Sequence, residues 1–267
     1  MKMELFIYII LGIIQGFTEP LPISSSGHLM IFKDLFEFSL TDLNFEIIVN
    51  FGSFIAIFFI FRKVIFELVS SFFIYIFNKD KRSEHLDNFK YCWLIVVASI
   101  PVAIIGFFAK DYIESLLSIK LVGCALLVTG LFLFLVRNKN GKKDDSNLSF
   151  KDAIIIGLFQ VVALFPGISR SGATLIGCLF TGLDNKTALK YTFMLYFPVS
   201  VGTMLLSIAD LASIDSSLML NYGIGMIASM IVTYFAYKWF AKLVTNGNLW
   251  KFSIYCFIVG ILTIIFL

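Results

Sequence analysis

Two short polar breaks interrupt an otherwise apolar chain, and they hold the residues best suited to chemistry. The first break carries Glu19, Ser25 and His28, and the second carries Arg170. Ser25 and His28 lie three residues apart, so on one helix they would be neighbours and could form a nucleophile and its base. Arg170 offers a planar fork of donors that suits phosphate oxygens. We therefore predict Glu19, Ser25, His28 and Arg170 as catalytic residues of an anion-binding site.

Further polar and small residues in the two breaks are predicted to bind the substrate. They are Gln15, Ser24, Ser26, Gly27, Ser169, Ser171 and Thr174. The Ser–Gly runs can cap the helices that follow them and present free N–H groups, which attract anions. Structural interpretations stay open at this point: the serines as N-caps only, Gln15 and Gln160 as interhelical hydrogen-bonding residues, His28 as a core histidine, and Glu19 with Arg170 as a buried ion pair.

The composition indicates that much of the protein surface faces lipid. Of the 267 residues, 59% are hydrophobic and 15% are charged, and the mean hydropathy is +0.91. Soluble domains carry about 25% charged residues, so too few charges are present for a water-covered surface. The four cysteines lie in apolar stretches without a CxxC pair, which argues against a metal or redox site built on them. The membrane is the expected partner, and the net charge of +3 gives no reason to expect nucleic acid.

Six apolar segments are long enough to cross a bilayer, whose core takes about 20 helical residues. They are Leu43–Phe61, Cys92–Ala109, Ile119–Val136, Ala188–Ile208, Leu218–Tyr237 and Trp250–Leu267. A further apolar stretch, Val64–Phe77, is too short for a span, and the sequence leaves its placement open.

Two other apolar segments end early, at Pro, Gly and charged residues. Non-helical backbone at membrane depth must be covered by protein or line a cavity. We therefore predict two re-entrant helix pairs: Leu5–Phe17 with Ser25–Phe36, and Ala153–Phe165 with Ser171–Leu183. The expected fold is an all-α polytopic membrane protein with six transmembrane helices plus these two re-entrant pairs.

The two breaks are copies of each other at a constant spacing of 145 residues. The first copy reads G-I-I-Q-G-F-T-E-P-L-P-I-S-S-S-G from Gly12, and the second reads G-L-F-Q-V-V-A-L-F-P-G-I-S-R-S-G from Gly157. Three predicted spans separate the copies, and an odd number of crossings reverses the orientation of the second. We therefore predict inverted-topology repeats over 1–137 and 151–267, with the site at their interface.

The positions of Lys and Arg predict which loops face the cytoplasm. Most basic residues gather in four regions: residues 62–90, residues 137–151, Lys186 with Lys190, and residues 238–251. All four fall on one side if the six spans alternate and the two broken segments do not cross. We predict that this side is cytoplasmic, and that the linker 138–150 is a flexible hinge between the halves.

The two motifs resemble the signatures of the bacterial undecaprenyl-diphosphatase family, UppP, also called BacA for bacitracin resistance. They read Q-G-F-T-E-P-L-P-I-S-S-S-G-H from Gln15 and P-G-I-S-R-S-G-A-T from Pro166. Length, motif spacing and span pattern extend the similarity over the whole chain. The resemblance implies hydrolysis of undecaprenyl diphosphate to undecaprenyl phosphate and inorganic phosphate, which recycles the lipid carrier for peptidoglycan synthesis and confers bacitracin resistance.

The resemblance also implies a multi-pass enzyme of the bacterial plasma membrane, with its active site open to the outer face. It implies a divalent cation, Mg²⁺ or Ca²⁺, near Glu19. The family's Ser, His and Arg fall on Ser25, His28 and Arg170. Gln15 departs from the family pattern, since many members carry Glu there, so the metal site has Glu19 with only the amide of Gln15 as a second candidate ligand.

Two other functions fit parts of the pattern. Inverted repeats with broken helices are typical of transporters, so a transporter or flippase for an anionic polyprenyl lipid is the main alternative. A non-catalytic assembly subunit is a third interpretation, but it leaves the buried charges unexplained. The Ser25–His28 pair beside Glu19 favours hydrolysis, because transport does not need it. The sequence leaves open whether Ser25 or a water molecule attacks the phosphorus, and whether the protein is a homodimer.

Overall fold

The computed structural model describes residues 2–36, 43–139, 141–207, 214 and 217–267, and the regular structure in these ranges is helical apart from one isolated bridge between Lys143 and Leu183. The helices are α1 (Lys2–Thr18), α2 (Ser25–Leu35), α3 (Leu43–Phe77), α4 (Arg82–Ser115), α5 (Ile119–Val136), α6 (Phe150–Val162), α7 (Arg170–Phe180), α8 (Asn185–Leu206), α10 (Met219–Thr245) and α11 (Trp250–Phe266), with short 3-10 turns η1 (Lys79–Lys81) and η2 (Asp145–Asn147).

Five of these helices, α3, α4, α5, α8 and α10, are long and apolar enough to cross a membrane. The shorter α1 and α11 are also apolar, with 17 residues each. The predicted span Ala188–Ile208 corresponds to α8, which ends at Leu206; Ile208 lies outside the described residues. The prediction of an all-α, multi-pass membrane protein is therefore confirmed at this level.

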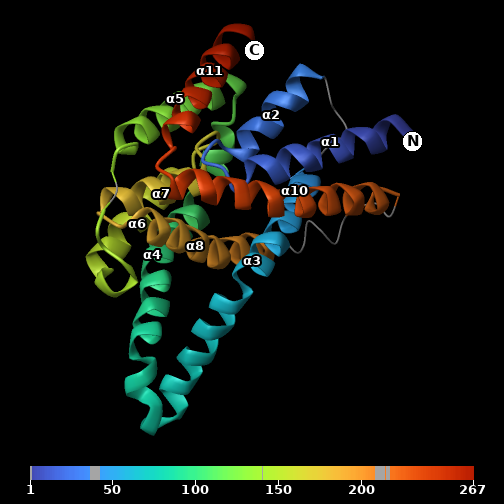
Figure 1. The fold of residues 1–267 in the computed structure, drawn as a ribbon. Coiled ribbons are helices and arrows are strands. Elements are labelled where there is room, and N and C mark those ends of the chain that lie inside the picture. Colours follow the sequence, from blue (N-terminus) through green and yellow to red (C-terminus); the bar gives the residue numbers. More distant parts are fainter. Residues whose placement is uncertain (1, 37–42, 140, 208–213, 215–216) are drawn as a thin grey trace.

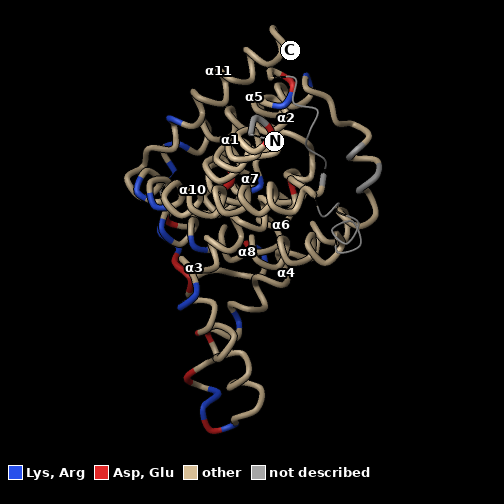
Figure 2. Tube along the Cα trace, turned by 90° about the vertical axis from the view of Figure 1, so that its right-hand side faces the viewer, with Lys and Arg blue, Asp and Glu red and all other residues tan. Residues whose placement is uncertain are grey.

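Helices α3 and α4 form a long hairpin that projects from the helical body (Figure 1), and charges of both signs gather at its tip (Figure 2). The helices have 35 and 34 residues, far more than a bilayer core requires. Val64–Phe77 is thus no separate element but the continuation of α3, and the predicted bounds Leu43–Phe61 and Cys92–Ala109 were too short.

Contacts between the two arms explain why the hairpin stays helical beyond the predicted spans. Ser71 on α3 is buried and lies 3.0 Å from both His85 Nδ1 and Asn88 Nδ2 on α4. The rings of Tyr75 and Phe89 stack with centroids 4.0 Å apart. Residues 53–77 contain neither Gly nor Pro, so no helix-breaking residue interrupts this arm.

The two short helices α1 and α6 each pack closely on a long helix through a glycine. A Cβ at Gly12 would lie 2.3 Å from the carbonyl oxygen of Gly225 on α10, and one at Gly157 would lie 2.5 Å from the carbonyl oxygen of Ala98 on α4. Small residues at helix contacts in membranes allow this backbone approach. Because Gly12 and Gly157 are equivalent in the repeat, the first helix of each half rests on a long helix of the other half.

Both predicted pairs of short helices are broken where the sequence indicated. Between α1 and α2 lie Pro20 and Pro22, and between α6 and α7 lie Pro166 and Gly167. Proline removes a backbone donor, and Gly167 has φ +88°, which a side chain would disfavour. These residues stop each helix after a few turns and leave a stretch of irregular backbone in the interior.

Residues 141–149 of the linker are hydrogen-bonded to the second half. They differ in this from the flexible hinge that the sequence predicted. The backbone N–H of Lys143 donates to Gly182 at 3.1 Å, and its carbonyl accepts from the N–H of Asp184 at 2.9 Å. Its side chain forms an ion pair with the buried Asp152 at 2.9 Å. These bonds connect the linker to the start of α6 and to the turn before α8.

Candidate active site

The two helix breaks meet in space, although 145 residues separate them in the sequence. The hydroxyls of Ser169 and Ser171 donate to the carbonyl oxygen of Leu21, at 3.3 and 2.9 Å. Ser24 caps α2 by accepting from Gly27 N–H at 3.2 Å, and Ser169 caps α7 in the same way. The first turns of α2 and α7 are thereby fixed beside each other, with their free N–H groups at one place.

A polar cavity of about 110 Å³ lies where the two breaks meet. Most of the predicted site residues line it: Gln15, Glu19, Ser24, Ser25, Ser26, Ser169, Arg170 and Ser171. The apolar side chains Leu29, Ala163 and Ile168 complete part of its wall. Two separate segments of sequence therefore line one cavity.

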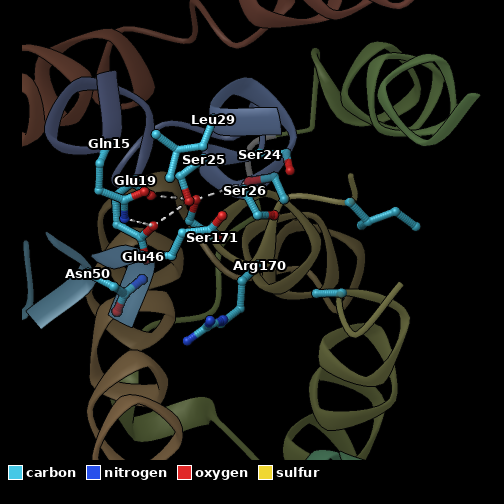
Figure 3. A pocket seen from close by; sticks show the side chains of 13 residues that line it. Gln15, Glu19, Ser24, Ser25, Ser26, Leu29, Glu46, Asn50, Arg170 and Ser171 are labelled. Carbon is cyan, nitrogen blue, oxygen red and sulfur yellow. Dashed lines mark hydrogen bonds between the residues drawn. The ribbon is translucent and has the colours of Figure 1, made fainter. Parts of the chain in front are cut away.

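Glu19 is the centre of the hydrogen-bonding network in this cavity (Figure 3). Its Oε2 accepts from the amide Nε2 of Gln15 at 2.9 Å and from the hydroxyl of Ser25 at 2.5 Å. Gln15 lies in the last turn of α1 and Glu19 directly follows this helix, so the two residues are one turn apart and share a face. A carboxylate that accepts from a serine hydroxyl is placed to take its proton, which makes Ser25 a candidate nucleophile with Glu19 as its base.

Ser24 has an unusual backbone conformation, with φ +68°. The left-handed region costs an L-residue about 1–2 kcal/mol, and such residues concentrate at functional sites, where the surroundings maintain them. The equivalent residue of the second half, Ser169, has φ −70°. The positive φ is thus specific to the half that supplies Glu19 and Ser25, and it lies at the cap immediately before Ser25.

His28 does not pair with Ser25, contrary to the prediction from their spacing. Its Nδ1 lies 2.7 Å from the carbonyl oxygen of Ser24, and its Nε2 lies 2.8 Å from the hydroxyl of Tyr255 on α11. The imidazole is buried, stacks on the Tyr255 ring and does not line the cavity. Neighbouring helix positions made a contact with Ser25 feasible, but both ring nitrogens are engaged elsewhere, so His28 supports the start of α2.

Arg170 lies across the cavity on α7. No ion pair joins it to Glu19 within the described residues, so the structural ion pair considered from the sequence is not formed. The guanidinium carbon lies 5.9 Å from the centroid of the Tyr196 ring, and Nη1 has no hydrogen-bond partner in the described part of the chain. Arg170 lines the cavity without an ion-pair partner in the described part of the chain, so its guanidinium can bind an anionic ligand there.

Two predicted substrate-binding residues lie behind the cavity wall. Gly27 donates its N–H to the Ser24 cap, and a Cβ there would lie 3.0 Å from Val122 on α5. Thr174 donates its hydroxyl to the carbonyl oxygen of Arg170, one turn earlier on α7. Both residues act on the helix starts rather than on the cavity, because helical geometry directs them away from it.

Two residues that sequence reasoning did not assign to the site, Glu46 and Asn50, line the cavity from α3. Glu46 accepts from Lys33 on α2 at 2.6 Å, which links α3 to the second helix of the break. The available signal was a pair of polar residues four apart in an apolar span, which places both on one helix face. Glu46 and Asn50 extend the polar wall beyond the two repeated motifs.

The donors in this cavity are compatible with a hard divalent cation. Within the described residues, no three His, Cys, Asp or Glu side chains converge. Mg²⁺ is commonly held by one or two carboxylates together with substrate phosphate oxygens, so Glu19 alone can anchor it. Gln15 donates through Nε2, which leaves its amide oxygen as a second ligand. The residues present therefore fit a cation that is shared with a phosphate-containing ligand.

Comparison with known proteins gives a consistent assignment. A family model described as "Bacitracin resistance protein BacA" matches residues 8–262. "Undecaprenyl-diphosphatase 1" of Bacillus cereus is 44% identical over 263 residues, which cover 97% of each chain. "Undecaprenyl-diphosphatase" of Oceanobacillus iheyensis is 42% identical over 97% of this chain and 96% of the relative, and "Undecaprenyl-diphosphatase 1" of Halalkalibacterium halodurans is 36% identical over 96% and 94%. The chain with this two-part polar cavity therefore belongs to the BacA family of bacitracin resistance proteins.

Proposed function

We propose that this membrane protein hydrolyses undecaprenyl diphosphate to undecaprenyl phosphate and inorganic phosphate. This activity recycles the lipid carrier for peptidoglycan synthesis and confers resistance to bacitracin. The observation that carries the proposal is the hydrogen bond from Ser25 to Glu19, inside a cavity that also contains Arg170. Full-length relatives named undecaprenyl-diphosphatase support the same substrate. Transport alone requires no paired nucleophile and base, so hydrolysis accounts for more of the cavity.

In the proposed reaction, the terminal phosphate lies between Ser25 and Arg170. The Ser25 oxygen attacks the terminal phosphorus while its proton passes to Glu19, and the bond to the bridging oxygen breaks, releasing undecaprenyl phosphate. Water then attacks the phosphoserine, which restores the hydroxyl and releases inorganic phosphate. Arg170 and the N–H groups at the starts of α2 and α7 stabilise the developing negative charge. Direct attack by a water molecule that Glu19 activates is the alternative route.

A divalent cation, Mg²⁺ or Ca²⁺, is part of the proposal. Glu19 and the amide oxygen of Gln15 would hold it, and when bound it neutralises charge on the diphosphate. His28 has a supporting role here: it fixes the first turn of α2, to which Ser25 belongs, through its contacts with Ser24 and Tyr255.

We further propose six transmembrane helices and two re-entrant pairs, arranged as inverted repeats over 1–137 and 151–267. Supporting this, the equivalent glycines Gly12 and Gly157 make equivalent close contacts with the other half. The equivalent caps Ser24 and Ser169 begin α2 and α7 beside one cavity. At 13 residues, α6 is too short to cross a bilayer core, which is consistent with a re-entrant helix.

The proposed location is the bacterial plasma membrane, with the active site open to the outer face. Contacts among the basic regions support a common cytoplasmic side. Lys190 pairs with Asp145 of the linker at 2.6 Å and lies 4.9 Å from the Tyr91 ring at the base of the hairpin. Lys190 therefore contacts the linker region and Tyr91, the residue directly after Lys90 at the end of region 62–90, which supports a common cytoplasmic side.

The test is release of inorganic phosphate from undecaprenyl diphosphate by the purified protein in detergent. We expect the wild type to release phosphate and Arg170→Ala to release it at least about 100-fold more slowly. The matched control Arg82→Ala should release phosphate at the wild-type rate. Arg82 lies at the hairpin tip, where it donates to the backbone carbonyls of Tyr75 and Ile76 and lies 5.6 Å from the centroid of the Tyr75 ring. A folded wild type that releases no phosphate would overturn the proposed hydrolysis.

A further inference from the structure

A second, smaller cavity lies on the other side of Arg170. It has a volume of about 10 Å³ and is lined by Gln160 of α6, Thr174 of α7, and Thr192 and Tyr196 of α8, among others. Arg170, Glu19 and Ser171 line both cavities. We call the smaller one the inner chamber; its wall toward the active site is formed by residues of the proposed catalytic machinery.

The inner chamber concentrates buried polar atoms that have no hydrogen-bond partner in the described part of the chain. Gln160 is 1% exposed, and neither its Nε2 nor its Oε1 has a hydrogen-bond partner among the described residues. Two further atoms lack a hydrogen-bond partner among the described residues: the hydroxyl of Tyr196, a residue that is 7% exposed, and Nη1 of Arg170. Buried polar groups without partners are costly and are rare in folded proteins unless water or a ligand satisfies them.

Comparison of the two halves explains why Gln160 has no hydrogen-bond partner within the ranges that the structure describes. Its equivalent in the first half, Gln15, donates to Glu19 four residues later. The residue four positions after Gln160 is Leu164, which offers no acceptor in its side chain. An apolar residue at position 160 would pack in this interior without unmet hydrogen bonds, so the amide at this position needs another explanation.

We infer that the inner chamber holds one ordered water molecule, and that Gln160 and Tyr196 position Arg170 through it; this inference rests on the proposed function. A volume of about 10 Å³ accommodates about one water molecule, and it is too small for a phosphate group. The water accepts from Arg170 Nη1 and exchanges hydrogen bonds with the amide of Gln160 and the hydroxyl of Tyr196. These three partners match the number that a buried water usually has.

The water and the Tyr196 ring together would restrict the guanidinium from two sides. The ring centroid lies 5.9 Å from the guanidinium carbon, within the range of a cation–π contact. A long side chain such as Arg otherwise has many rotamers, and its donors must face the phosphate to stabilise the transition state. We therefore assign Gln160 and Tyr196 as positioning residues for Arg170; the Tyr196 hydroxyl also lies near Glu19 and Ser200.

The kinetic test uses Tyr196→Phe, which keeps the ring, and Gln160→Leu, which removes the amide. The matched control is Tyr91→Phe: Tyr91 is 5% exposed, its hydroxyl also has no partner among the described residues, and it lines neither cavity. We expect each test variant to lower kcat about tenfold through misplacement of Arg170, with KM within about twofold. The control should retain wild-type kcat. In an Arg170→Lys background, Gln160→Leu should not lower kcat further.

A crystallographic test judges the inference independently of activity. In the wild type, we expect one water within hydrogen-bond distance of Gln160, Tyr196 and Arg170. In Gln160→Leu, this water should be absent and the guanidinium displaced. The inference would be overturned by a chamber without water, by a bromide ion in the chamber of a bromide-soaked crystal, or by an Arg170 that does not move in Gln160→Leu. It would also be overturned if Gln160→Leu lowered kcat equally in the wild type and in the Arg170→Lys background. A wild type that contains the water but releases no phosphate would instead refute the proposed function.

Discussion

Replacing Gly12 by alanine tests how closely the first half rests on the second. The added Cβ would lie 2.3 Å from the carbonyl oxygen of Gly225, whereas ordinary contacts of a Cβ begin at 3.4 Å. The opposing atom belongs to the backbone of α10 and cannot rotate away. Helix α1 must therefore move by about 1 Å, and a forced expansion of this kind costs about 1–3 kcal/mol.

The movement should also reach the active site. Glu19 follows Gly12 by seven residues, about two helical turns along the same rigid element. Displacement of a reacting group by about 1 Å can reduce turnover by about 100-fold. We therefore expect Gly12→Ala to unfold at lower denaturant concentration and to have a kcat/KM about 100-fold below that of the wild type, measured by phosphate release.

Gly223→Ala is the matched control, on the same helix pair but without a close neighbour. Among the described residues, nothing lies within 4 Å of a Cβ at Gly223, which is inside α10. Alanine is favoured over glycine in a helix interior by about 1 kcal/mol, so this variant should be at least as stable as the wild type and fully active. The reasoning is refuted if Gly12→Ala matches Gly223→Ala in both stability and activity.

Three further perturbations have definite expected outcomes. His28→Gln should retain kcat/KM within about tenfold of the wild type, since His28 lies outside the cavity; a loss near that of Ser25→Ala would restore it as a catalytic base. Lys143→Met should lower the free energy of unfolding by about 1 kcal/mol, because Lys143 is 41% exposed and solvent screens its ion pair with Asp152. Burial alone would raise the pKa of Asp152, but hydrogen bonds from Lys143 and Ser149 hold it below 3.8. The difference in free energy of unfolding between wild type and Lys143→Met should therefore be full above pH 5 and should shrink as the pH falls below that value. A difference that stays constant in acid would contradict this. EDTA should abolish phosphate release, and Mg²⁺ or Ca²⁺ should restore it, whereas unchanged release would exclude the cation.

The repeated motif allowed much of the cavity lining to be predicted, because its polar residues lie at helix breaks. Proline and glycine dictated where α1 and α6 end, and the matched serines dictated where α2 and α7 begin. Residues that immediately flank these breaks, such as Glu19 and Arg170, therefore came out in one cavity. Their positions depend on local backbone chemistry, which sequence records directly.

Features that depend on distant contacts could not be predicted in the same way. His28 was expected beside Ser25, but Tyr255, 227 residues away, determines where its ring lies. The length of α3 depends on its pairing with α4, for example through Ser71 and His85. Asn50 lines the cavity only because α3 packs beside both breaks.

The central claim is that Ser25 and Glu19 act as one unit in phosphoryl transfer. The most direct test is a double-mutant cycle on phosphate release from undecaprenyl diphosphate with wild type, Ser25→Ala, Glu19→Gln and the double variant. We predict that each single variant lowers kcat/KM by at least about 100-fold, and that the double variant is no slower than the slower single variant. Losses that multiply in the double variant, or a Ser25→Ala protein that turns over at the wild-type rate, would contradict the account.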